Sequence, residues 1–236
     1  MPFGFYYFDY TYFLFIVPAF LVTMVAQVRV SSAFSKYSRI GTMRNLTGAE
    51  AARAVAEHGG AFGVSVQRIA GNLTDNFDPR TNVIHLSAGV YGSSSIAAVG
   101  VAAHEAGHAV QHARGYLPNK IRTALVPVTN IGSKLSFPLI LIGLILPVQY
   151  DFIVYAGIAL FALVVLFQLA TLPVEFNASA RAVETLRETE MLYPDELEGA
   201  KKVLRAAAMT YLAASFSAFM NLLRLLVIAG NRRGRD

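Results

Sequence analysis

The amino-acid sequence predicts a mainly α-helical membrane protein with a small β-hairpin and three or four transmembrane helices. Of its 236 residues, 55% are hydrophobic, and the mean hydropathy is +0.47, which is too apolar for an ordinary soluble domain. Several apolar runs reach or approach the length that a helix needs to cross a bilayer, about 20 residues. By contrast, residues 63–70 and 81–87 are short and strand-like, the first with alternating apolar and polar side chains.

The first apolar run, residues 5–28, is long enough to span a bilayer and has aromatic side chains crowded at its N-terminal end, as expected at a membrane interface. No basic residue precedes the run and no small-residue cleavage site closes it, so we expect no cleaved signal peptide. Four basic residues follow, at Arg29, Lys36, Arg39 and Arg44. Because basic segments stay in the cytoplasm, we expect the N-terminus outside the cell membrane and the residues after the run inside.

Residues 29–135 are expected to form a cytoplasmic region with its own secondary structure. Thr47 and Glu50 have the spacing of a capping box and predict the start of a helix. The two strand-like stretches then predict a β-hairpin, joined by a polar turn at residues 72–80. This hairpin would either pair with extended substrate at its edge or be a purely structural element.

A helix is predicted over residues 95–114, because serines offer N-cap oxygens before it and a turn with glycine and proline follows it. The helix contains His104-Glu105-x-x-His108, and its two histidines fall on one helical face, about one turn apart. Two imidazoles so placed can bind one zinc ion, and Glu105 is then close enough to take a proton from a zinc-activated water. The alternative is a buried helix whose histidines make ordinary hydrogen bonds.

A catalytic zinc ion normally has three protein ligands and one open position, and a chain without cysteine has no thiolate to offer. His112 continues the series, but each step of four residues turns about 40° and climbs about 6 Å, so we expect it beside the ligands or on the surface. His58 and His85 are isolated and are expected to be structural. The preferred third ligand is Glu175, on a helix that restarts after Pro173.

Residues 136–172 predict a transmembrane helical hairpin that turns near Asp151 and returns to the cytoplasmic side. The return would deliver Glu175 to the membrane surface that carries the two histidines. Residues 173–236 then hold the helix of the third ligand and a C-terminal apolar helix, which is expected to begin near Pro194 and to stop at Gly230.

The C-terminal apolar helix has two possible placements. If it spans the bilayer, Arg232, Arg233 and Arg235 lie outside, against the positive-inside bias. Otherwise the helix lies against the core and returns its tail to the cytoplasm. In either placement, Arg224 within its apolar half must face protein, water or headgroups.

The resemblance of this chain to a known family rests on residues 73–80, 84–87, 95–111, 172–181 and 208–214. These stretches are similar to the YugP-like family of bacterial membrane zinc metallopeptidases. The resemblance implies a membrane-embedded peptidase with a zincin-like core, in which His104 and His108 bind zinc and Glu105 is the base. A looser similarity to HtpX-type and CAAX-processing membrane gluzincins implies that Glu175 also binds zinc. Those families carry an aspartate four residues after this glutamate, where the present chain has Ser179.

We therefore expect a membrane-embedded endopeptidase with one zinc ion per chain, which hydrolyses peptide bonds with a zinc-activated water at the cytoplasmic membrane surface. Tyr211, from the resemblance, and Arg181 are candidate donors to the oxyanion. The expected partners are a peptide or membrane-protein substrate and the lipid bilayer, whereas no motif indicates nucleic acid. The alternative function is a non-catalytic zinc-binding membrane scaffold or quality-control partner.

Overall fold

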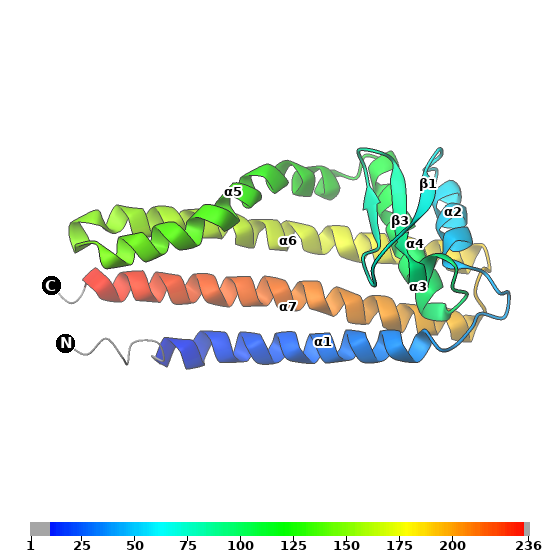
Figure 1. Ribbon diagram of the computed structural model, residues 1–236, viewed down its shortest axis with the longest axis horizontal. Helices are drawn as coiled ribbons and strands as arrows, with labels where there is room; N and C mark the ends of the chain where they lie inside the picture. Colours follow the sequence, from blue (N-terminus) through cyan, green and yellow to red (C-terminus); the bar gives the residue numbers. More distant parts are fainter. Residues whose placement is uncertain (1–9, 234–236) are drawn as a thin grey trace. The chain divides into compact units, whose positions relative to one another are not determined.

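The computed structural model describes residues 10–233, a mainly helical chain with one small sheet (Figure 1). The first five residues of the predicted span 5–28 lie outside the described residues, as does Arg235. The helices are α1 (Val17–Tyr37), α2 (Gly48–His58), α3 (Ala88–Tyr91), α4 (Ile96–Ala113), α5 (Leu117–Ile145), α6 (Asp151–Glu188) and α7 (Pro194–Arg233). A π-helical segment, Tyr12–Ile16, precedes α1, and a 3-10 turn, Val148–Tyr150, precedes α6. The strands are β1 (Ser65–Ile69), β2 (Asn76–Asp78) and β3 (Val83–Ser87).

The chain divides into two compact units. One, here called the helical unit, contains the described residues 10–26, 121–171 and 211–233. The other, here called the mixed unit, contains residues 27–120 and 172–210. The long helices α1, α5, α6 and α7 each begin in one unit and end in the other.

A three-stranded sheet with the order β1-β3-β2 lies in the mixed unit. Strands β1 and β3 fall on the two predicted stretches, but they pair in parallel, with Val66 opposite Ile84. The antiparallel partner of β3 is β2, with Phe77 opposite Ile84, inside the segment that was predicted to be a turn. The hairpin of this protein is therefore β2–β3, and the predicted pairing of β1 with β3 in a hairpin is wrong. The long connection between β1 and β3 permits a parallel pair, which a tight turn would not.

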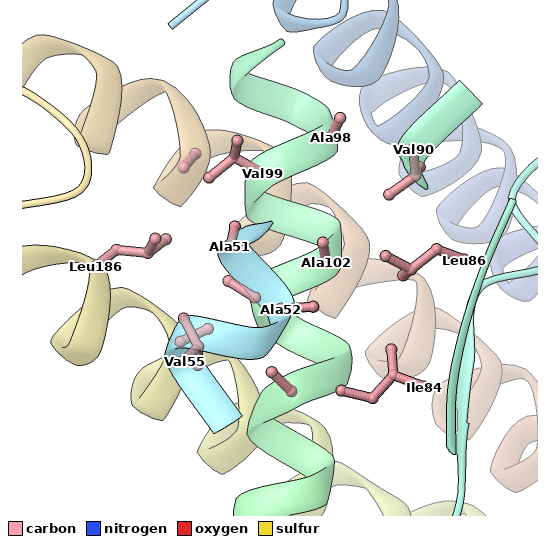
Figure 2. Close-up of a cluster of buried hydrophobic side chains, with 14 of the residues drawn as sticks. Ala51, Ala52, Val55, Ile84, Leu86, Val90, Ala98, Val99, Ala102 and Leu186 are labelled. Atoms are coloured by element: carbon pink, nitrogen blue, oxygen red, sulfur yellow. The ribbon is translucent and has the colours of Figure 1, made fainter. Parts of the chain in front are cut away.

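Helix α4 lies at the centre of the hydrophobic core of the mixed unit (Figure 2). Figure 2 shows Val55 of α2, Leu86 of β3 and Leu186 of α6 directed at α4 from different sides. The facing side chains of α4 are small, and Ala102 among them is fully buried. Small side chains on α4 let several elements pack against one helix at short range.

The two helices that build this core begin at caps that the sequence predicted. At the start of α4 the Ser95 hydroxyl accepts a hydrogen bond from the backbone N–H of Ala98, at 3.2 Å. At the start of α2, Thr47 and Glu50 form a complete capping box. These contacts satisfy backbone donors that a helix start otherwise leaves without a partner.

Helices α4 and α6 touch backbone to backbone at Gly107. A Cβ atom on Gly107 would lie 2.4 Å from the carbonyl oxygen of Ala178 in α6, so only glycine permits this approach. Gly107 is three residues after His104, and Ala178 is three residues after Glu175. The close contact therefore sets the separation between the histidine pair and the glutamate.

Four helices in the described residues are long and apolar enough to cross a membrane: Tyr12–Tyr37, Leu117–Ile145, Val148–Glu188 and Pro194–Arg232. Together with the small sheet, they confirm the predicted fold class of a mainly helical membrane protein. In the helical unit, Ile140 of α5 and Val154 and Ile158 of α6 pack with Leu225 and Ala229 of α7.

Two of these helices are longer than the sequence predicted. The hairpin was expected to begin at residue 136, but α5 begins at Leu117 and contains Pro127 and Pro138. The helix of Glu175 was expected to restart after Pro173, but α6 passes through this proline without interruption. Prolines are tolerated within transmembrane helices, because neighbouring groups satisfy the backbone carbonyls that proline leaves without a donor.

Helix α7 continues past Gly230, so the predicted stop is wrong. Near its end, the Nε of Arg232 lies 3.2 Å from Oδ1 of Asp151, the first residue of α6. The same guanidinium donates hydrogen bonds to the carbonyls of Gly143, at 2.6 Å, and Leu146. Helix α7 is thus one continuous helix whose end lies beside the α5–α6 turn.

Arg224 of α7 faces protein, which was one of the environments that the sequence allowed. Its guanidinium carbon lies 5.4 Å from the centre of the Tyr12 ring, a cation–π distance. At the same end of the helical unit as Arg232, Asn231 donates a hydrogen bond to the Tyr10 hydroxyl at 3.3 Å. The described start of the first long helix therefore lies beside the end of α7.

Candidate metal centre

Helices α4 and α6 bring three metal-binding side chains together in the mixed unit. Oε2 of Glu175 lies 3.3 Å from Nε2 of His104 and 3.5 Å from Nε2 of His108. One ligand atom from each of the three residues lies within 4.8 Å of the other two. The rings of His104 and His108 stand nearly perpendicular, with centroids 4.7 Å apart. Two imidazole nitrogens and one carboxylate oxygen are a donor set that zinc binds in proteins.

In both histidine rings, Nε2 faces Glu175 and the other nitrogen, Nδ1, contacts a neighbouring side chain. Nδ1 of His104 lies 3.0 Å from the Ser179 hydroxyl, and Nδ1 of His108 lies 3.1 Å from Oε1 of Gln111. Because an amide oxygen only accepts, Nδ1 of His108 is the donor in this contact, and Nε2 is the nitrogen that faces Glu175. Such partners fix the orientation of metal-binding histidines.

Gln111 connects the two helices that carry the donors. Its side chain is completely buried, and its Nε2 donates to the carbonyl of Val174 at 2.7 Å and to Oδ1 of Asn177 at 3.0 Å. Reasoning from the sequence did not identify Gln111 or Asn177. The sequence did carry a signal for Gln111. It lies three residues after His108, so its side chain can contact that histidine on the same helical face.

The electrostatic environment of the three donors suits a cation. Burial lowers the pKa of His108, but the hydrogen bond to Glu175 and the charges of Glu105 and Glu175 raise it more, so the pKa lies above its ordinary value. The two carboxylates thus stabilise a positive charge on this ring. Glu175 itself is only 3% exposed, and buried carboxylates need a positive partner. A divalent metal between the three side chains fits this requirement.

Glu105 lies on α4 next to His104 and is half-buried. It is not one of the three converging donors, yet its charge acts on the ring of His108. A carboxylate beside the donors, and not among them, is available for proton transfer.

The other histidines lie elsewhere. His112 is exposed and packs against the ring of Phe77, with centroids 5.8 Å apart, so it is on the surface and away from the donors. His58 contacts Glu188 at 3.2 Å, and Nδ1 of His85 lies 3.3 Å from Oδ1 of Asn76. None of the three belongs to the donor group.

The two candidate oxyanion donors differ in their surroundings. Nε of Arg181 donates to Oδ1 of Asn177 at 2.7 Å, and its guanidinium carbon lies 5.8 Å from the centre of the Tyr116 ring. Arg181 is therefore joined, through Asn177, to the amide of Gln111. Tyr211 is the first residue of the last segment of the helical unit, and its role as a donor stays a prediction.

Comparison with known proteins agrees with this geometry. A family model described as "Putative neutral zinc metallopeptidase" matches residues 12–230, which include the three donors and Glu105. The chain is 41% identical over 225 residues to the "Putative membrane protease YugP" of Bacillus subtilis (strain 168). This alignment covers 95% of the present chain and 98% of the relative. No solved structure matches the chain.

Proposed function

Because the chain belongs to the neutral zinc metallopeptidase family, we propose that it is a membrane-embedded endopeptidase that holds one zinc ion. The proposed ligands are His104, His108 and Glu175. The proposed general base is Glu105. This is a gluzincin-like arrangement, in which a glutamate from a second helix completes the two-histidine motif.

The observation that carries the proposal is the convergence of His104, His108 and Glu175 within 4.8 Å, from residues up to 71 positions apart in the chain. A structural histidine pair has no need of a buried carboxylate between its two Nε2 atoms. The contacts to Ser179 and Gln111 support the same conclusion, since they present both Nε2 atoms to one point.

The proposed reaction is hydrolysis of a peptide bond. When bound, zinc supplies Lewis-acid activation of the water and polarisation of the substrate carbonyl. Glu105 accepts a proton from the attacking water as the oxygen–carbon bond forms. It then returns this proton to the amide nitrogen as the carbon–nitrogen bond breaks, so that one acid and one amine are released.

A hydrogen-bond donor to the developing oxyanion is the remaining requirement. Tyr211 and Arg181 are the two candidates for this role. The Nε of Arg181 is already engaged by Asn177, and its guanidinium lies over Tyr116. Arg181 is better suited to position Asn177, and through it Gln111 and His108.

The proposed location is the cell membrane, with several spans and the metal centre facing the cytoplasm. Four candidate spans support the membrane assignment. The basic residues Arg29, Lys36 and Arg39 follow the first apolar run and support the orientation. At the other end of the spans, Arg232 is paired with Asp151. Because its charge is paired, Arg232 counts less against this orientation than a free basic residue would. The substrates proposed for such a site are membrane proteins or membrane-tethered peptides.

The alternative is a membrane scaffold that binds zinc without catalysis, and Glu105 distinguishes the two functions. Zinc content and cleavage of casein and of a membrane-protein substrate are measured for wild type, Glu105→Gln and Glu175→Ala. We expect Glu105→Gln to keep zinc and lose cleavage, and Glu175→Ala to lose zinc. A zinc-loaded wild type that cuts no substrate would favour the scaffold, whereas zinc retained by Glu175→Ala would refute the third ligand.

A further inference from the structure

A groove of about 600 Å³ runs between α6 and α7 within the mixed unit. Its apolar lining comes from one face of each helix: Phe176, Ala180, Val183, Leu204, Ala208 and Met209. The spacing of three and four residues on each helix makes these side chains a continuous apolar strip along the groove. The volume lies in the range of pockets that hold a small amphiphilic ligand, roughly 300–1,000 Å³.

Charged side chains line the other part of the groove. Arg187, Lys201 and Arg205 contribute three positive charges, and Glu184 contributes one negative charge. Arg187 pairs with Glu184 at 2.7 Å, and Lys201 pairs with Glu198 at 2.6 Å. Arg205 is exposed and makes no close ion pair among residues 10–233, and its charge acts on the nearby Glu198. The lining therefore carries an excess of positive charge, concentrated where Arg205 is available to an anion.

The apolar and charged parts follow a fixed order along both helices. On α6 the lining runs from Phe176 to Arg187, and on the antiparallel α7 it runs from Met209 back to Lys201. From Phe176 to Arg187 the helix rises about 16 Å. Both helices are candidate spans over nearly their whole length. The apolar part of the lining is nearer in sequence to their most apolar segments, residues 152–172 and 211–229, and the positive part is further from these segments.

This order matches an anionic phospholipid in the cytoplasmic leaflet, whose acyl chains point to the bilayer and whose phosphate points away. Phe176 and Met209 are 48% and 40% exposed, which favours an apolar occupant over water. A free phosphate ion would leave the apolar strip uncovered. Arginine and lysine near a membrane surface attract anionic headgroups.

We propose that the groove between α6 and α7 binds one anionic phospholipid. An acyl chain lies along the apolar strip, and the phosphate contacts Arg205 and Lys201. The site does not depend on the proposed peptidase function. It lies beside the metal centre, however, because Ser179 lines the groove and its hydroxyl also contacts Nδ1 of His104.

The test uses the full chain in a mild detergent, titrated with phosphatidylglycerol or with phosphatidylcholine of the same acyl chains, and native mass spectrometry of the complexes. We expect the first phosphatidylglycerol to bind more tightly than phosphatidylcholine. Arg205→Gln should weaken this binding about fivefold, as expected for one basic residue at a lipid headgroup. The matched control is Lys202→Gln, which removes a charge from α7 outside the groove lining and should leave the first binding unchanged.

A second variant tests the apolar strip without altering charge. Ala180→Trp fills the groove, and we expect it to reduce the binding of phosphatidylglycerol while its unfolding temperature stays near that of wild type. Equal binding of the two lipids, or unchanged binding in Arg205→Gln and Ala180→Trp, would overturn the proposal. Displacement of the lipid by an equal concentration of inorganic phosphate would overturn it as well. The inactive variant Glu105→Gln can be used throughout, so failure of the peptidase assignment leaves this test intact.

Discussion

Nδ1 of His104 lies 3.0 Å from the hydroxyl oxygen of Ser179, one helical turn after Glu175. The HtpX-type and CAAX-processing gluzincins, which the sequence resembles loosely, carry an aspartate at the position where this chain has Ser179. The serine hydroxyl orients the imidazole without adding a second negative charge beside Glu175. The position that departs from the wider pattern is thus still in contact with a proposed ligand.

Loss of the Ser179 hydroxyl should weaken metal binding. We expect Ser179→Ala to lower zinc affinity about tenfold, because partners of ligating histidines typically contribute a factor of about 10 to 100. Competition with a chromogenic chelator measures the change. Ser133→Ala is the control, since that hydroxyl donates to the carbonyl of Asn130 in its own helix. An unchanged affinity in Ser179→Ala would show that the hydroxyl does not orient His104.

Replacement of Gln111 should affect both stability and metal affinity. Gln111→Leu removes the donor to the Val174 carbonyl and the acceptor for Nδ1 of His108. Leaving such buried groups without partners costs about 1–3 kcal/mol each. We expect a lower unfolding temperature and weaker zinc binding. Gln67→Leu, on the exposed side of β1, should change neither by a comparable amount.

The two glycines of α4 give opposite predictions for the same substitution. Gly107→Ala places a methyl group 2.4 Å from the Ala178 carbonyl oxygen, and such overpacking costs about 1–3 kcal/mol. Because the helices must separate there, we expect zinc to be lost from detergent-purified protein. At Gly100 the same methyl group would meet the Ala200 side chain at an ordinary 3.4 Å.

We therefore expect Gly100→Ala to keep zinc and to be stabilised by up to about 1 kcal/mol, from the higher helix propensity of alanine. Thermal unfolding and metal analysis of both variants provide the measurement. Equal behaviour of Gly107→Ala and Gly100→Ala would contradict the close approach of α4 and α6.

Separation of the Arg232–Asp151 pair should destabilise the helical unit. Asp151→Ala leaves a partly buried guanidinium without its carboxylate, which costs about 3–5 kcal/mol for a fully buried pair. Asp151→Ala combined with Arg232→Leu removes both charges, and we expect it to be more stable than Asp151→Ala alone. Thermal unfolding in detergent gives the comparison. If the double variant is less stable than Asp151→Ala, the ion pair with Arg232 does not explain the contribution of Asp151 to stability.

Metal removal should abolish cleavage without unfolding the mixed unit. The core around α4 is built from packed alanine and valine side chains and holds the donors independently of an ion. We expect a chelator to remove activity while helicity, measured by circular dichroism, stays within a few per cent, and added zinc to restore activity. Loss of most helical signal on chelation would show that the metal is needed for folding.

Local sequence patterns predicted the local features of this fold. The cap at Ser95 and the capping box of Thr47 and Glu50 depend on residues three positions apart, which a sequence displays directly. The donors His104 and His108 are likewise set by helical spacing. Glu175 was chosen because a returning span would bring it back to the histidines, and the structure places it within 3.5 Å of both.

Features that depend on distant contacts were missed. Apolar alternation identified β1, and a short strand-like run identified β3, but neither carries information on strand direction, and the polar turn residues concealed β2. The early start of α5 was missed because Gly115 and Pro118 resemble a helix stop, and because Lys120, Arg122 and Lys134 indicate a cytoplasmic segment. Gln111 resembled an ordinary polar helix residue, because its partners Val174 and Asn177 lie more than sixty positions away.

The uninterrupted course of α6 through Pro173 sets the distance along one helix between Asp151 and Glu175. Asp151 and Glu175 lie on one helix, and 24 residues of rise separate them by about 36 Å. A bilayer core is about 30 Å thick. With Asp151 at the outer boundary, Glu175 would emerge only about 6 Å beyond the inner one. For the peptidase function proposed above, we expect scissile bonds to be selected by their height above the lipid, so that bonds close to a membrane anchor are cut and bonds in distant loops are not.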